Sequence, residues 1–163
     1  MEVLRLHGAS DVRIHHEPRP EPAPGEELVR VTAVGLCGSD LHWYEDGGIG
    51  ESVVDEPLVL GHELGGVIVS GPREGERVIV EPANTCGGCE HCRVGNGNLC
   101  PDVRFLGHAP INGGLREYMA WPQRLMLPAP DTIEGDDIAL QEPLGIALHC
   151  IDLSHFKPCM SAG

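Results

Sequence analysis

The stretch CGGCEHCRVGNGNLC, residues 86–100, contains four of the seven cysteines in the chain, and its chemistry decides how the rest of the sequence is interpreted. The cysteines follow the spacing C-x2-C-x2-C-x7-C, and the glycines between them permit tight turns that bring the thiols together. Such thiols could form a disulfide framework, a metal cage or a redox centre, or simply be buried. Four thiolates at about 2.3 Å suit tetrahedral Zn²⁺ and leave no open position, which is typical of a structural site. We therefore predict a structural zinc site in this segment, the cysteine lobe, with the ligands Cys86, Cys89, Cys92 and Cys100.

The N-terminal sequence favours a reducing compartment, in which clustered cysteines bind metal more often than they form disulfides. Residues 1–18, MEVLRLHGASDVRIHHEP, lack the apolar core of a signal peptide. No apolar run approaches the roughly 20 residues that a membrane span requires. We therefore expect a cytoplasmic protein. His91 should face solvent, because four sulfurs already complete the metal shell, and Cys150 and Cys159 lie outside any metal-binding spacing.

Composition limits the class of partner. The chain has 163 residues, which suits one domain with a core, and only 4% of them are aromatic, so the core must consist mainly of Val, Leu, Ile and Ala. The formal net charge is −14, and Lys157 is the only lysine. Because no basic face is available to release counterions, we expect neither nucleic acid nor an anionic membrane surface as a partner.

Short apolar runs bounded by Gly and Pro predict a mainly β domain. The expected strands are residues 2–7, 11–16, 27–36, 65–70, 76–82, 115–122 and 124–128. Residues 17–27 are rich in proline and should form a surface connection, and residues 71–76, GPREGE, should form a hairpin turn. A partly open β-barrel that carries a metal-binding lobe fits this pattern.

Helix is expected only near the C-terminal end of the sequence. Residues 136–153, DDIALQEPLGIALHCIDL, have helical character, and either Asp131 or Asp136 could cap their N-terminus. Pro143 should either interrupt the first turns or begin a second helix.

A second group of metal-ligating residue types lies outside the cysteine lobe. Cys37 follows a predicted strand, and His62 and Glu63 stand together where a later strand begins. A thiolate, an imidazole and a carboxylate make a three-ligand set that leaves Zn²⁺ an open fourth position for water or substrate. From these residues alone, a buried cysteine and a core-facing histidine are the favoured interpretation, and the metal site is the alternative.

Four motifs follow one another along the chain: CGSDLH at 37–42, GHE at 61–63 followed by Gly66, the cysteine lobe, and EPL at 142–144. This order resembles that of the zinc-dependent medium-chain dehydrogenases, and the whole chain resembles their N-terminal catalytic domain, which is GroES-like in fold. Within that family it looks most like the sorbitol, xylitol and related polyol dehydrogenases. The segments CGSDLHWYEDGGIG, NLCPDVRFLG and QEPLGIALH carry this closer match.

The resemblance implies two zinc ions per chain, one structural and one catalytic. Cys37, His62 and Glu63 would be ligands of the catalytic ion, and Glu142 would reach it directly or through its bound water. Asp40 would hold the zinc-bound imidazole of His62 without contacting the ion itself.

The resemblance also implies roles around the reacting group. Ser39 and His42 match the residues that relay the substrate proton towards solvent. Trp43, Phe105 and His108 would line the substrate pocket. Trp43 stands where sorbitol dehydrogenases often have Tyr, and His108 stands where a small residue is usual, so the particular polyol is left open.

The reaction that the resemblance implies is oxidation of a small alcohol or polyol by hydride transfer to NAD or NADP. The sequence contains no G-x-G-x-x-G motif for a dinucleotide. We therefore expect residues 1–155 to form the catalytic domain and residues 156–163 to be the truncated start of a missing Rossmann domain. Full-length relatives in this family are homo-oligomers. The alternative is an inactive zinc-stabilised fragment or binding module that turns nothing over.

Overall fold

The computed structural model describes residues 1–155, 157, 159 and 160. The expectation that residues 156–163 begin a second domain falls for the most part outside the described residues. Within the described ranges, no helix has the length and apolar character needed to cross a membrane.

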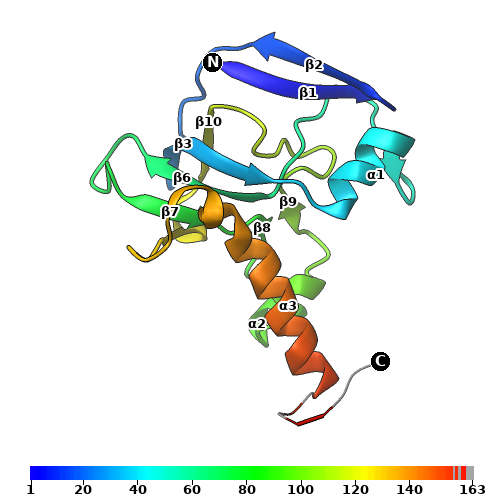
Figure 1. Cartoon of the computed structure of the whole chain (residues 1–163), viewed down its shortest axis with the longest axis vertical. Helices are drawn as coiled ribbons and strands as arrows, with labels where there is room; N and C mark the ends of the chain where they lie inside the picture. Colours follow the sequence, from blue (N-terminus) through cyan, green and yellow to red (C-terminus); the bar gives the residue numbers. More distant parts are fainter. Residues whose placement is uncertain (156, 158, 161–163) are drawn as a thin grey trace.

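The centre of the fold is a five-stranded antiparallel sheet with the order β10-β3-β6-β7-β11. Its strands are β3 (Glu26–Gly35), β6 (Glu63–Ile68), β7 (Arg77–Val80), β10 (Tyr118–Pro122) and β11 (Met126–Pro128). The strands β10 and β11 occupy opposite edges, yet only the 3-10 turn η2 (Gln123–Leu125) separates them in sequence. Because three residues can span only about 10 Å, the two edges must approach each other. The sheet therefore curls into the partly open barrel expected from the sequence (Figure 1).

The barrel is filled by aliphatic side chains, as the low aromatic content predicts. The main cluster of buried residues comprises Val29, Leu64, Ile68, Val78, Val80, Leu106, Met119, Trp121, Leu125 and Met126. Each of the strands expected from the sequence is present, with ends shifted by no more than three residues. Residues 71–76 form the expected turn between β6 and β7, in which the N–H of Gly75 donates to the carbonyl of Ile68.

A separate hairpin covers one side of the barrel (Figure 1). It consists of β1 (Glu2–Gly8) and β2 (Asp11–His16). Isolated bridges from Val3 to Arg116 and from Leu6 to Leu58 attach it to the rest of the fold. Leu6, Trp43, Leu58 and Leu60 form a second buried cluster beneath it.

The helix α1 (Gly38–Asp46) corrects the expectation that helix occurs only near the end. Its N-cap is Cys37, whose N–H donates to the Asp40 carboxylate at 3.0 Å. It ends at Gly47, which has a φ of 72° and donates its N–H to the Trp43 carbonyl. Only Asp40 and Trp43 are buried, so the helix lacks the apolar periodicity that marks amphipathic helices. The capping interactions of Cys37 and Asp40 at its start and of Gly47 at its end determine where this helix forms.

Several short elements were also absent from the sequence-based expectation. These are β4 (Gly48–Ile49), β5 (Ser52–Val53), β8 (Ala83–Asn84), β9 (Arg104–Phe105), α2 (Glu90–Arg93) and η1 (Gly97–Leu99). The last two shape the cysteine lobe. A pair of two-residue strands has no detectable alternation in sequence, because its stability comes from the surrounding fold.

The expected C-terminal helix is divided into the 3-10 segment η3 (Gly135–Leu140) and α3 (Gln141–Ser154). Pro143 lies in the first turn of α3, where its missing N–H has no partner to lose. The expected caps are wrong, because Glu134 and Leu140 occupy the N-cap positions and neither makes a side-chain cap hydrogen bond. No residue of α3 is buried, and the helix extends away from the barrel (Figure 1).

Candidate metal centres

The first candidate centre forms where the end of β3 meets the start of β6. These strands are antiparallel neighbours, and Gly35 is paired with Glu63. Cys37 follows β3 and His62 directly precedes Glu63, so the pairing brings all three ligand types together. The Sγ of Cys37, a ring nitrogen of His62 and a carboxylate oxygen of Glu63 lie within 4.8 Å of one another. A single ion can therefore contact all three atoms, and this donor set suits Zn²⁺.

Asp40 holds the two ligand-bearing segments together. It is only 2% exposed. One carboxylate oxygen accepts the N–H of Cys37 at 3.0 Å, and the other accepts the N–H of Gly61 at 2.9 Å. The first oxygen also lies 3.8 Å from Nδ1 of His62. Asp40 therefore fixes the backbone beside both Cys37 and His62, which suits the role of supporting the His62 imidazole that the family resemblance implies.

Gly35 helps to shape the three-donor centre and is not among the residues predicted from the sequence. A Cβ added there would lie 2.3 Å from Oε2 of Glu63, so the glycine leaves the space that the carboxylate occupies. The signal could be found only after β3 and β6 had been aligned, because it depends on which residue faces Glu63 across the sheet.

Glu142 lies beside this centre, in the first turn of α3. Burial raises its pKa, His62 lowers it, and the carboxylates of Glu63 and Glu81 raise it further. These electrostatic interactions place Glu142 near the ligands. Among the described residues, however, the donors within 4.8 Å of one another are Cys37, His62 and Glu63, and Glu142 is not included. Glu142 thus borders the three-donor centre.

Three further residues expected at the site are Ser39 and His42, which lie on α1, and Phe105, which lies beside His62. Ser39 is partly buried, whereas His42 is exposed and its Nδ1 lies 3.2 Å from an Asp46 carboxylate oxygen. The ring of Phe105 packs against His62 with centroids 5.2 Å apart.

The last two expected pocket residues contact each other. Trp43 meets His108 edge-on, with ring centroids 5.4 Å apart and an interplanar angle of 86°. Because Trp43 is only 1% exposed, the surface it can offer to a ligand is small, and its main contact supports the ring of His108.

The second candidate centre is the cysteine lobe. All four sulfurs of Cys86, Cys89, Cys92 and Cys100 lie within 4.8 Å of one another, and those of Cys86 and Cys92 are 4.0 Å apart. Tetrahedral coordination with bonds of about 2.3 Å places sulfurs about 3.8 Å apart, so the four thiols fit one ion with little movement. His91 is outside this group, and 39% of its side chain is exposed.

Backbone N–H groups point at three sulfurs of the cysteine lobe. Cys86 donates to Cys100, Cys89 to Cys86, and Cys92 to Cys89, each at 3.4 Å. The N–H groups of Gly88 and Cys89 lower the pKa of Cys86 to about 7. Such hydrogen bonds favour the thiolate, which is the form that binds a metal.

A large cavity in the described part of the structure lies away from both centres. Its volume is about 720 Å³, and it is lined by residues including Arg5, Ser52 and Asn112. None of the candidate metal ligands lines it, so the size of this cavity carries no information about the chemistry at Cys37 and His62.

A curled antiparallel barrel that carries a three-donor centre and a four-thiol lobe defines a class of β domains with two candidate metal centres. Comparison with known families agrees with this class, because residues 23–131 match the alcohol dehydrogenase GroES-like domain. The match covers more than half of the chain, so the chain belongs to this family. The expectation of a GroES-like domain is therefore confirmed.

Individual relatives lie among the polyol dehydrogenases. The chain is 39% identical to sorbitol dehydrogenase of Bacillus subtilis, with 97% of this chain and 46% of the relative covered. It is also 39% identical to probable D-xylulose reductase A of Neosartorya fischeri, with 96% and 46% covered. Among solved structures, L-idonate 5-dehydrogenase of Escherichia coli matches with a TM-score of 0.86 at 31% identity, covering 93% of this chain and 46% of that one. The chain thus spans about half the length of the relatives it matches.

Proposed function

We propose that this chain supplies the zinc-bearing catalytic part of a dehydrogenase that oxidises an alcohol or polyol. In this reaction the alcohol loses a proton and a hydride and becomes a carbonyl compound, with NAD or NADP as the hydride acceptor. The observation that carries the proposal is the convergence of Cys37, His62 and Glu63 at the β3–β6 junction. The relatives support it, because they are named for the dehydrogenation of sorbitol and the reduction of D-xylulose.

The three donors suit a catalytic rather than a structural ion. A thiolate and a carboxylate together balance the charge of Zn²⁺, and three protein ligands leave one position open. When bound, the ion acts as a Lewis acid that makes a substrate hydroxyl easier to deprotonate. Glu142 borders the donors, so we assign it to the open side of the centre, where it can orient a second hydroxyl of a polyol.

Ser39 and His42 provide a route for the proton that the alcohol loses. They are three residues apart on α1 and therefore share one face of the helix. Ser39 is partly buried, whereas 68% of the His42 side chain is exposed. A proton accepted by the Ser39 hydroxyl can pass to the ring of His42 and from there to solvent. Phe105 packs on His62 and forms the apolar side of the substrate position.

Metal analysis of three variants tests the proposal. The wild-type chain should contain two zinc ions, Cys37→Ser should retain one, and Cys89→Ser should lose the ion of the cysteine lobe. Cys150→Ser is the matched control, because Cys150 is an exposed thiol on α3, and it should retain both ions. A Cys37→Ser variant that still binds two zinc ions with unchanged affinity would rule out the catalytic centre.

A further inference from the structure

Arg116 is a cation with almost no partner in the described part of the chain. Its Nε atom is buried and makes no hydrogen bond. Its Nη2 donates one long hydrogen bond of 3.5 Å, to the carbonyl of Asn112. The ion pairs among the described residues do not include Arg116. Buried charges are normally paired and hydrogen-bonded, because removing an unpaired charge from water is unfavourable.

Arg116 nevertheless keeps its charge. Burial and, to a smaller extent, nearby Arg5 lower its pKa and Glu17 raises it, so that together they bring the pKa of Arg116 to about 10. A pKa of about 10 still leaves the guanidinium protonated at neutral pH. A buried N–H donor without a partner indicates a ligand, water or ion that would satisfy it.

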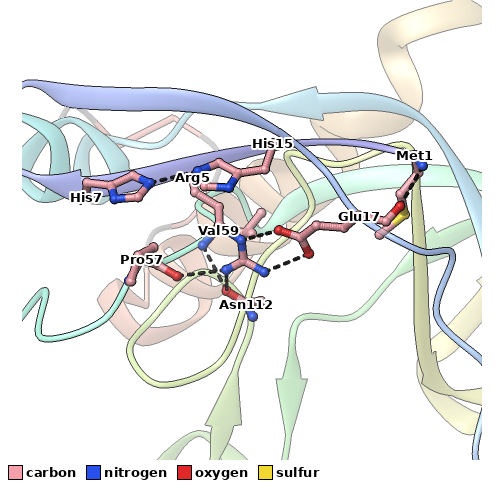
Figure 2. A network of polar contacts seen from close by, with 8 residues as sticks. All are labelled: Met1, Arg5, His7, His15, Glu17, Pro57, Val59 and Asn112. Carbon is pink, nitrogen blue, oxygen red and sulfur yellow. Dashed lines mark hydrogen bonds and ion pairs between the residues drawn. The ribbon is translucent and has the colours of Figure 1, made fainter.

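Glu17, the carboxylate that raises the pKa of Arg116, is already paired with Arg5. Figure 2 shows that Arg5 binds both oxygens of Glu17, at 2.5 and 3.0 Å. Arg5 also donates to the carbonyl of Pro57 at 2.7 Å and to Oδ1 of Asn112 at 3.2 Å. That same Asn112 oxygen accepts the N–H of Val59. This network therefore satisfies Arg5 and leaves the positive charge of Arg116 unbalanced.

Arg116 lines a small polar cavity together with a second arginine. The cavity has a volume of about 240 Å³, and its walls include Arg104, Asn112, Glu26 and Trp121. Arg104 is exposed, and no described ion pair includes it. Two arginines and one glutamate give the walls a net positive charge, although the whole chain has a formal charge of −14.

Two other cavities that Arg116 borders have a different character. They are lined mainly by apolar residues such as Leu4 and Leu115, and their only other charged residues are Glu117 and, in one of them, Glu2. Neither contains a second arginine. The cavity beside Arg104 is therefore where an anion would meet two cations.

We propose that the cavity between Arg104 and Arg116 binds a small oxyanion, either a carboxylate or a phosphate group. The planar guanidinium presents several N–H donors in a fork that matches these groups. The volume is sufficient for a phosphate or a short carboxylic acid. Trp121 and Ile111 provide an apolar wall for the remainder of such a ligand.

The test titrates the zinc-loaded full chain with sodium phosphate and, separately, with sodium acetate at constant ionic strength. The backbone amide signals of Asn112 and Ala120, two residues that line the cavity, report binding by NMR. We expect a saturable shift with at least one anion, and the anion that binds identifies the phosphate or the carboxylate class. Arg104→Gln and Arg116→Gln should each weaken binding about tenfold or more.

Two controls separate this site from other sources of anion binding. Arg30→Gln removes the same charge from an exposed position on β3 outside the cavity, and it should leave binding unchanged. Cys37→Ser should also leave binding unchanged, because the cavity is lined by none of the candidate metal ligands. If Arg116→Gln fails to fold, the exposed Arg104 decides the question alone.

The proposal is overturned if neither anion gives a saturable shift. It is also overturned if Arg30→Gln weakens binding as much as Arg104→Gln, which would indicate a general charge effect. Loss of binding in Cys37→Ser would place the anion at the metal centre instead.

Discussion

Replacing Gly35 with alanine should disrupt the proposed metal centre at Cys37, His62 and Glu63 while leaving the fold nearly unchanged. The new Cβ would lie 2.3 Å from Oε2 of Glu63, 3.1 Å from its Cβ and 3.4 Å from its Cδ. Carbon and oxygen atoms without a bond require more than 3 Å, so the carboxylate must move by about 1 Å. Metal–ligand distances tolerate only about 0.2 Å. The displaced Glu63 can then no longer share an ion with Cys37 and His62.

The expected loss of zinc affinity in Gly35→Ala can be given a magnitude. A disturbance of this size is comparable to the loss of a supporting interaction around a metal, which costs about 10- to 100-fold in affinity. That range corresponds to about 1.4 to 2.8 kcal/mol. The clash mainly involves the end of a flexible side chain, so the free energy of unfolding of the metal-free protein should change by less than about 1 kcal/mol.

Chelator competition on the zinc-loaded protein measures the effect. Gly35→Ala should release one zinc ion at a lower chelator concentration than wild type and retain the ion of the cysteine lobe. Gly38→Ala is the matched control, because Gly38 lies on the other side of Cys37 and an added Cβ there meets no atom within 4 Å. Equal zinc affinity in Gly35→Ala and wild type would refute the assignment of Glu63 as a ligand.

Three further predictions address the support of the site, the hairpin and the cofactor. Asp40→Asn leaves an N–H of Cys37 or Gly61 without an acceptor, so it should destabilise the protein by about 1–3 kcal/mol and weaken zinc binding in the chelator assay, whereas exposed Asp55→Asn should do neither. The hydrogen bond from Arg5 lowers the pKa of Glu17 below its ordinary value of about 4.5. This pair should therefore contribute stability above about pH 4.5 and lose it as the pH falls through the lower, folded-state pKa. Glu17→Gln should flatten the acid side of the pH profile of stability measured by urea denaturation, and an unchanged profile would contradict the role of the pair. NADH should show no saturable binding to this chain. Micromolar affinity would contradict this expectation, because it would require a nucleotide site that no motif in the sequence indicates.

The sequence predicted the barrel well because its strands are buried apolar runs. β3, β6 and β10 fill the same core, and each run ends at glycine, proline or charged residues that mark its boundary. The helix α1 was missed because its stability depends on the Cys37–Asp40 cap and on Gly47, and not on an apolar face.

The candidate metal centres were predictable to different degrees. The cysteine lobe is local in sequence, so its spacing alone indicated four converging thiols. The three-donor centre needed the family resemblance, because Cys37 and His62 converge only through the register of β3 and β6. Gly35 and Arg116 could not be found in this way. Their significance comes from what faces them in space, which a single sequence does not encode in any local pattern.

The cysteine lobe and the three-donor centre should lose their zinc ions at different stages of unfolding. The four thiols lie within 15 consecutive residues, 86–100, so even a largely denatured chain can gather them around zinc. The three-donor centre exists only while two strands are in register, so its ion should dissociate as soon as the barrel opens. During urea denaturation, release of the first zinc should therefore coincide with barrel unfolding, while the second ion stays on a chain that has already lost its tertiary structure.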